Sequence, residues 1–196
     1  MTSGDNRIQR RPFVADLLSH RDGAVVVPGL GSPTWDCAAA GDSPDYLYSW
    51  GGMGLAVPTA LGLALAQPER RVLALTGDGE MLMGIGSLGV VANQTPSNLG
   101  ILVLDNESFG ETGRQTGLTA GASDLCKVAE GFGIKRTKLV TAQEDVGSLA
   151  DFLFVEPGPS FAVAKIALSQ DPWCLPIKDG RAIARRMRVA LGTEQG

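Results

Sequence analysis

Short apolar runs alternate with helix-like stretches along the whole chain. Five runs are rich in Val, Leu and Ile and have the length of strands; they lie at 24–29, 71–77, 99–106, 137–141 and 160–168. Apolar positions with helical spacing occupy 6–20, 54–66, 86–94, 123–132, 144–154 and 179–191. Because strands separated by helices form parallel sheets, the pattern predicts an α/β fold with an open, mostly parallel sheet and helices on both faces.

Composition and charge narrow the class of protein. The 196 residues, 44% hydrophobic and 19% charged, suffice for one core, and no linker or repeat divides them, so we treat 1–196 as a single domain. A net charge of −4 disfavours nucleic acid as a partner, because phosphate binding needs a basic face. No run reaches the length of a membrane span, and three scattered cysteines are typical of reduced thiols, so we expect a soluble cytoplasmic protein.

Two glycine patterns in the segment 74–91 indicate different cofactors. Gly84, Gly86 and Gly89 have the spacing of a dinucleotide fingerprint, which would make the chain a nicotinamide-dependent oxidoreductase. That fingerprint has to begin directly at the end of a strand, because its first glycine makes the strand-to-helix turn. Residues 78–83 separate Gly84 from the predicted strand, so we interpret these glycines as allowing close helix packing.

The second pattern stands where a strand ends. Gly77, Asp78 and Gly79 follow the predicted strand 71–77, and the next strand ends in Asp105 and Asn106. Neighbouring parallel strands would bring these oxygen donors to one edge of the sheet, where ligands bind in open α/β folds. Mg²⁺ prefers such oxygens and completes its shell with phosphates and water. Taken alone, Asn106 could instead cap a turn and Asp105 could be solvated.

A Gly-Asp-Gly followed about thirty residues later by Asn resembles the signature of thiamine diphosphate enzymes, in the domain that binds the diphosphate. The resemblance runs from about Val25 to Thr141 and includes the segments YSWGGMGLAVPTALGLALA and LDNESFGETGRQTG. Within the family, the second segment most resembles sulfopyruvate and phosphonopyruvate decarboxylases. Carboligases of the acetolactate synthase type and transketolase-like enzymes are the alternatives within the same family.

The resemblance implies roles for particular residues. Asp78, the Asn106 side chain and the Ser108 carbonyl would ligate Mg²⁺. The residues implied in binding thiamine diphosphate and its metal are Gly31, Ser32, Gly51, Met53, Gly77, Asp78, Gly79, Glu80, Asn106, Ser108, Phe109 and Gly110. Glu80 departs from the decarboxylases, which often carry a small residue there, and its carboxylate would have to turn away from the diphosphate.

Two residues are implied in catalysis. Met53 matches the bulky apolar residue that holds thiamine in its bent form, and the Gly51 carbonyl matches the acceptor of the 4'-amino group. Bending lets the cofactor deprotonate itself at C2 before the carbanion attacks a 2-oxo acid. Without the surrounding WGGMG, Met53 would be read as core filler.

Full-length enzymes of the family also contain a pyrimidine-binding domain with an activating glutamate, for which the sequence before Gly77 leaves no room. The resemblance therefore implies a separate pyrimidine-binding subunit and a hetero-oligomer. His20, the single histidine, falls at the end of the first predicted helix and is expected to be structural.

Four residues lie near the predicted site by position only. Arg114 and Gln115 could meet the anionic group of a small-molecule 2-oxo acid substrate, although a surface arginine is the simpler interpretation. Glu111 and Thr112 stand in the same loop, and nothing in the sequence assigns them a role.

Overall fold

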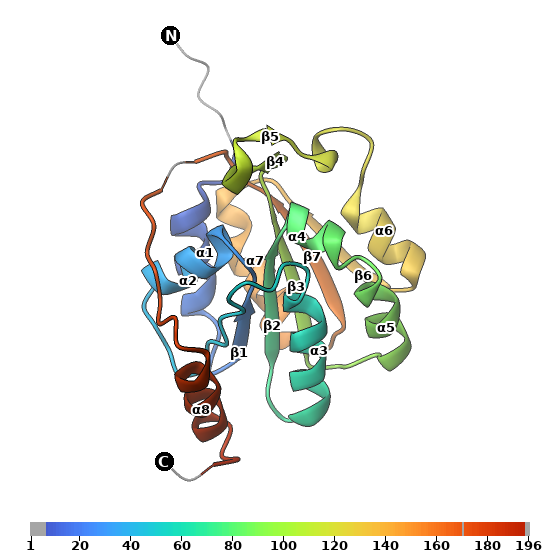
Figure 1. The fold of residues 1–196 in the computed structure, drawn as a ribbon. Coiled ribbons are helices and arrows are strands. Elements are labelled where there is room, and N and C mark those ends of the chain that lie inside the picture. Colours follow the sequence, from blue (N-terminus) through green and yellow to red (C-terminus); the bar gives the residue numbers. More distant parts are fainter. Residues whose placement is uncertain (1–6, 170, 195–196) are drawn as a thin grey trace.

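The computed structural model describes residues 7–169 and 171–194. Its centre is a five-stranded parallel sheet in the order β1-β2-β3-β7-β6 (Figure 1). The strands are β1 (Val25–Pro28), β2 (Val72–Gly77), β3 (Leu99–Asp105), β6 (Arg136–Val140) and β7 (Ser160–Lys165). The predicted parallel sheet is confirmed, and every predicted strand is present with ends that shift by at most three residues.

The protein has two hydrophobic cores, one on each side of the sheet, and successive residues of a strand belong to different cores. β3 is buried along its full length, with Leu102 and Leu104 in one core and Ile101 and Val103 in the other. Successive side chains of a strand point to opposite faces, so a fully apolar strand needs helices on both sides.

Helices cover both faces of the sheet, as predicted. α1 (Arg10–Ser19), α2 (Ser32–Ala39) and α7 (Val146–Ala150) lie on one face. The helices α3 (Ala56–Ala66), α4 (Asp78–Met83), α5 (Ser87–Gln94) and α6 (Leu125–Phe132) lie on the other. α8 (Gly180–Ala190) follows an extended segment and packs near the lower end in Figure 1, where it contributes to both cores.

The helices differ from the prediction in three places. α2 and α4 were not predicted, because both are short and each begins next to a glycine, Gly31 before α2 and Gly77 before α4. The predicted helix at 144–154 is a 3-10 turn (Gln143–Asp145), then α7, then a wider π turn (Asp151–Val155). Residue 6, the start of the predicted helix 6–20, lies outside the described residues.

The segment after β3 folds over the carboxyl ends of the strands, at the top of Figure 1. It contains β4 (Ser108–Phe109), the 3-10 turn η1 (Gly110–Thr112), β5 (Gln115–Thr116) and the 3-10 turn η2 (Leu118–Ala120). β4 and β5 pair antiparallel, with Ser108 opposite Thr116. Among the described residues, no helix has the length and apolarity needed to cross a membrane.

Candidate active site

A pocket of about 270 Å³ opens at the carboxyl ends of the central strands. Most of its lining comes from the turn after β1, the loop before α3, the start of α4 and the loop after β3, and Arg10 of α1 and Ile166 after β7 complete it. All but one of the predicted site residues lie on its wall, namely Gly31, Ser32, Met53, Gly77, Asp78, Gly79, Glu80, Asn106, Ser108, Phe109 and Gly110. The exception is Gly51, which is exposed in the loop before α3 with φ +73°.

Asp78 begins α4 and is buried, with 4% of its surface exposed. Its neighbour across the strand ends is the buried Asp105, and Thr119 Oγ1 lies 3.1 Å from Asp78 Oδ2 and 2.7 Å from Asp105 Oδ1. Burial and then the charge of Asp105 raise the pKa of Asp78 to about 6. Within the described part of the chain, Asp78 has no cationic partner.

Asp105 belongs to an ion-pair chain that the sequence did not predict. Lys165, at the end of β7, lies 2.7 Å from Asp105 Oδ2 and 2.8 Å from Glu107 Oε1. Arg7 pairs with the other Glu107 oxygen at 2.8 Å. Asp105 is therefore buried and paired, not solvated. The sequence could not predict this ion pair, because Lys165 lies 60 residues away from Asp105 along the chain.

The loop that carries Asn106 is held by its own backbone. Asn106 Oδ1 accepts a hydrogen bond from the Ser108 N–H at 2.9 Å, so the side chain does cap a turn, as the simpler interpretation held. An amide oxygen has a second lone pair, which leaves room for another partner. Glu107 between them has φ +59°, a conformation disfavoured for a residue with a side chain.

Glycines allow close approach around Asp78 and the start of α4. A Cβ built on Gly79 would lie 3.1 Å from the Phe109 ring and 3.8 Å from Met53 Cε, so these two side chains stand over the start of α4. A Cβ on Gly117 would lie 3.1 Å from Asp78 Oδ2 and 2.9 Å from the Glu107 carbonyl carbon. Larger residues at either position would push the walls apart.

Glu80 is buried at 4% exposure, and Thr76 Oγ1 donates to its Oε2 at 2.8 Å. Burial raises the pKa of this carboxyl, and hydrogen bonds from Thr76 and from nearby backbone N–H groups oppose that rise. Those N–H groups belong to Ala56, Gly54 and Leu30. The side chain thus points into the protein toward the start of α3, in line with the expectation that its carboxylate would turn away from the diphosphate.

Two features of the sequence lie outside the site. Gly84 and Gly86 stand between α4 and α5 and not at a strand end. A Cβ on Gly84 would come within 2.4 Å of the Gly54 carbonyl oxygen, so this glycine serves close packing, as expected. His20 caps the end of α1, before β1 begins, and its Nε2 lies 3.5 Å from Asp16 Oδ1.

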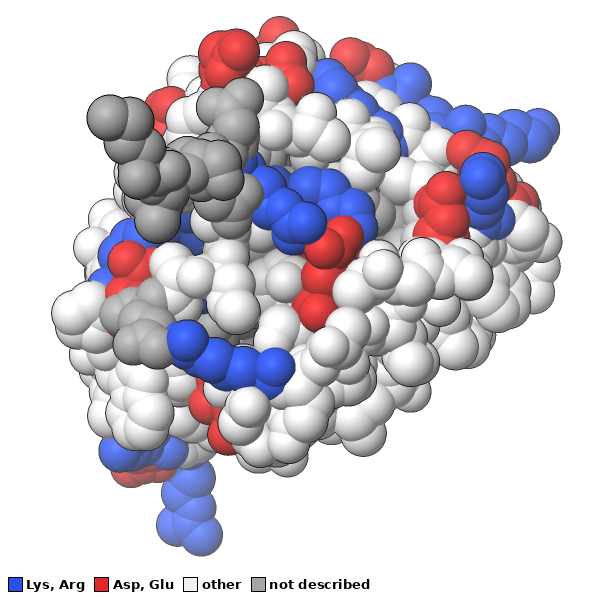
Figure 2. Space-filling view, turned by 90° about the horizontal axis from the view of Figure 1, so that it is seen from above, with Lys and Arg blue, Asp and Glu red and all other residues white. Residues whose placement is uncertain are grey.

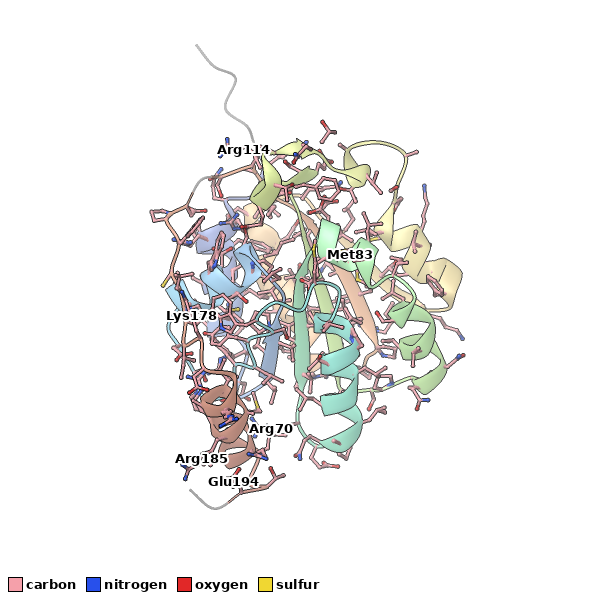
Figure 3. All side chains as sticks on the ribbon, in the orientation of Figure 1. Arg70, Met83, Arg114, Lys178, Arg185 and Glu194 are labelled. Carbon is pink, nitrogen blue, oxygen red and sulfur yellow. The ribbon has the colours of Figure 1, made fainter. Side chains whose placement is uncertain are left out.

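The residues after Gly110 stand at the mouth of the pocket. Glu111 and Thr112 contribute to its wall, and Glu111 also lines a neighbouring cavity of about 430 Å³ together with Arg114. Figure 3 shows Arg114 at the top of the molecule, in the loop between β4 and β5. Gln115 Nε2 donates to the Thr112 carbonyl at 2.8 Å, so this side chain is used within the loop.

Apolar side chains are exposed beside the pocket. Met53 is 40% exposed, Leu55 52% and Met83 65%. A Cβ on Gly54 would lie 3.3 Å from Met83 Cβ, so the end of α4 and the loop before α3 form one surface (Figure 3). Seen from above, charged groups gather around the centre, while a broad area at the lower right carries none (Figure 2). Exposed apolar surface of this kind is typical of protein interfaces.

Comparison with known families matches residues 37–164 to the C-terminal, cofactor-binding domain of thiamine pyrophosphate enzymes. The chain belongs to this family. Thiamine pyrophosphate is another name for thiamine diphosphate, so the family named by the sequence resemblance is confirmed. The match includes the end of β2, the start of α4 and the Asn106 loop, which together form most of the pocket.

Relatives within the family include two kinds of decarboxylase. The chain is 45% identical over 126 residues to the sulfopyruvate decarboxylase subunit beta of Methanothermobacter thermautotrophicus, covering 64% of this chain and 67% of the relative. It is 33% identical over 171 residues to the phosphonopyruvate decarboxylase of Streptomyces viridochromogenes, covering 87% of this chain. The chain spans 43% of the length of that second relative.

A solved structure shares the fold. A Mycobacterium smegmatis protein assigned to the thiamin diphosphate-dependent enzymes superposes with a TM-score of 0.70 at 23% sequence identity. The likeness covers 83% of this chain and 32% of that one. It confirms the open parallel sheet with helices on both faces as the fold of this family member.

Proposed function

We propose that this chain is the diphosphate-binding subunit of a two-chain, thiamine diphosphate- and Mg²⁺-dependent 2-oxo acid decarboxylase. The observation that carries the proposal is the pocket in which Asp78, Asn106 and Ser108 meet from neighbouring strand ends. Relatives named as sulfopyruvate and phosphonopyruvate decarboxylases support a 3-substituted pyruvate as the substrate.

Asp78, the Asn106 side chain and the Ser108 carbonyl would hold the metal. The donor set fits Mg²⁺, which takes oxygens from protein and completes its octahedron with phosphate and water. The buried Asp78 lacks a cation among the described residues, and it lies beside a second carboxylate with which it shares a single hydroxyl. Asp105 is already paired with Lys165, so a bound cation would chiefly stabilise the buried charge of Asp78.

Backbone groups would hold the diphosphate. Gly79 and Glu80 open α4, and Gly31 and Ser32 open α2, so each pair offers N–H groups without an intrahelical acceptor. Gly77, Phe109 and Gly110 complete the wall around this end of the pocket.

Met53 and the Gly51 carbonyl would shape the thiamine. When bound, the cofactor supplies a carbanion that attacks the 2-oxo acid and stabilises the charge left by departing CO₂. Met53 reaches over Gly79 and would hold the two rings in their bent arrangement. Gly51, with its left-handed backbone, would accept a hydrogen bond from the 4'-amino group.

A separate pyrimidine-binding subunit would supply the activating glutamate. The Methanothermobacter relative is named as a subunit beta, which supports an assembly of unlike chains. The exposed surface of Met53, Leu55 and Met83 borders the pocket where such a subunit would close it.

The test is product analysis with the chain and its co-purifying or adjacently encoded partner. Sulfopyruvate, phosphonopyruvate and pyruvate are each supplied with thiamine diphosphate and Mg²⁺, and CO₂ and aldehyde are measured. The proposal predicts one CO₂ and one aldehyde, shorter by one carbon, per 2-oxo acid, with loss of turnover on chelation of Mg²⁺. A product with a new carbon–carbon bond in place of the aldehyde would favour a carboligase or transketolase-like enzyme.

A further inference from the structure

One buried carboxylate connects three of the segments that line the pocket. Glu80 lies in the first turn of α4 and accepts a hydrogen bond from Thr76, at the end of β2. A Cβ built on Gly29 would lie 1.6 Å from Glu80 Oε2, and the three atoms nearest to it all belong to Glu80. The carboxylate therefore fills the space that any side chain at position 29 would need.

Backbone donors surround the same group. The backbone N–H groups of Leu30, Gly54 and Ala56 oppose the rise in the pKa of the carboxyl, although none of them reaches ordinary hydrogen-bond geometry and the buried Oε1 has no hydrogen-bond partner among the described residues. Ala56 opens α3, and the first N–H groups of a helix have no acceptor within it. An anion at this point interacts favourably with those nearby donors and with the helix dipole.

The connected segments are the ones that carry the proposed cofactor contacts. Leu30 precedes Gly31 in the turn after β1, Gly54 follows Met53 in the loop before α3, and Glu80 follows Gly79 at the start of α4. Moving the carboxylate would change the position of all three segments relative to one another.

We propose that Glu80 is a positioning residue that locks these three segments together before the cofactor binds. The identity of the cofactor rests on the proposed function. The positioning of the three segments by Glu80 does not, because it can be measured in the chain without a cofactor. A change in overall stability would not distinguish this role from that of any other buried acid, so the test has to report on the three segments themselves.

Amide hydrogen exchange measured by NMR on the chain without cofactor tests the proposal. The N–H groups of Gly54 and Ala56 should be protected, although groups at a helix start ordinarily exchange fast. Glu80→Gln keeps the shape but places an amide NH₂ among donors. It should therefore speed exchange at Leu30, Gly54 and Ala56 on the order of 10-fold, with the sheet unchanged.

Glu130→Gln is the matched control. Glu130 also accepts from a threonine, with Thr137 Oγ1 2.6 Å from its Oε1, but it is exposed on α6. It should leave exchange at Gly54 and Ala56 unchanged. Fast exchange of these two amides in the wild-type chain would overturn the proposal even if Glu80→Gln failed to fold, and so would equal effects of the two glutamine variants.

A double-mutant cycle gives an independent reading. Gly29→Ala should displace the carboxylate and speed the same amides, whereas in a Glu80→Ala background it should add little, because the space is free. Additive effects would contradict the proposal. In the complex with its partner, Glu80→Gln should lower kcat while leaving the KM for the 2-oxo acid nearly unchanged. If the chain fails to bind thiamine diphosphate at all, the proposed function fails while the exchange result stands.

Discussion

Asp78 and Asp105 lie side by side at the ends of β2 and β3, and the hydroxyl of Thr119 is shared between them. In the proposed function, Asp78 is the charged ligand of the metal. Replacing an outer partner of a metal site costs roughly 10- to 100-fold in affinity, so loss of a direct ligand should cost at least as much. Asp78→Ala should therefore abolish measurable Mg²⁺-dependent binding of thiamine diphosphate.

Calorimetric titration of the cofactor with and without Mg²⁺ measures this loss, and circular dichroism checks that the fold is intact. Asp16→Ala, which removes an exposed aspartate from α1, serves as the control and should bind normally. Unchanged cofactor affinity in Asp78→Ala would remove Asp78 from the site.

The raised pKa of Asp78 also predicts how stability depends on pH in the metal-free chain. Its folded value of about 6 exceeds the ordinary 3.8, so between these values the folded state holds a proton that the unfolded state has released. The free energy of unfolding should therefore fall as pH rises from 4 to 6, by up to about 3 kcal/mol. Asp78→Asn should lack this loss.

Denaturant unfolding of both proteins at pH 4 and pH 7, with metal removed, gives the comparison. All other titrating groups are common to the two proteins, so the difference between their pH dependences isolates Asp78. Identical pH dependence in the two proteins would show that the pKa of Asp78 is not raised in the folded chain.

Substitutions of Met53 test whether this residue holds thiamine in its bent form. Diphosphate and metal would still anchor one end of the cofactor in Met53→Ala, while the bent geometry would loosen. Turnover should fall on the order of 10- to 100-fold, and the affinity for thiamine diphosphate should change by less than about threefold. Met53→Leu, which keeps the bulk, should retain most of the turnover.

Steady-state kcat and cofactor binding in the complex with the partner provide both numbers. If the leucine variant were as damaging as alanine, size would not be the role of Met53. The residue would then be returned to ordinary packing at the pocket wall.

At the residue scale, the sequence predicted the groups that stand beside its own motifs. Asp78, Asn106 and Met53 could be predicted as site residues because each follows a strand end or lies within a recognisable segment. Thr119 and Lys165 were missed, because they reach Asp105 from distant parts of the chain and only the fold brings them there. For Glu80, the sequence predicted only that the carboxylate turns away from the diphosphate, and not which residues it contacts.

At the scale of elements, the end of β7 fixes the loop after β3. Lys165 contacts Asp105 and Glu107, the residues on either side of Asn106. Lys165→Met should release the loop and raise the Mg²⁺ concentration needed for cofactor binding on the order of 10-fold. Lys165→Arg should retain most of the wild-type affinity, because it can still pair with both carboxylates.

Titration of Mg²⁺ at a fixed thiamine diphosphate concentration measures that shift. Lys127→Met removes a lysine that is exposed on α6 and should not alter it. Equal Mg²⁺ requirements for Lys165→Met and the wild type would show that the ion pairs do not position Asn106.

The strands were predictable because each is a short, continuous apolar run buried on both sides. Their order was not predicted, since nothing local places β7 between β3 and β6. The short helices α2 and α4 escaped detection because their positions depend on glycine turns at strand ends and on packing. Six residues of α4 are too few to show helical spacing in a sequence.

At the scale of the whole molecule, the pocket opens beside uncovered apolar surface. Met53, Leu55 and Met83 project from the loop before α3 and the end of α4. A subunit that covered this surface would bury apolar area and close the cofactor site in one step, as expected for an obligate interface. The proposed function thus divides the cofactor site between two chains.

Decarboxylation by the purified chain, measured with and without its partner at saturating thiamine diphosphate and Mg²⁺, tests that claim most directly. We expect no turnover of sulfopyruvate, phosphonopyruvate or pyruvate by the chain alone, because the proposed function assigns the activating glutamate to the partner. We expect turnover on mixing, which should saturate at a fixed ratio of the two chains. Robust turnover by the chain alone would contradict the division of the site between two subunits.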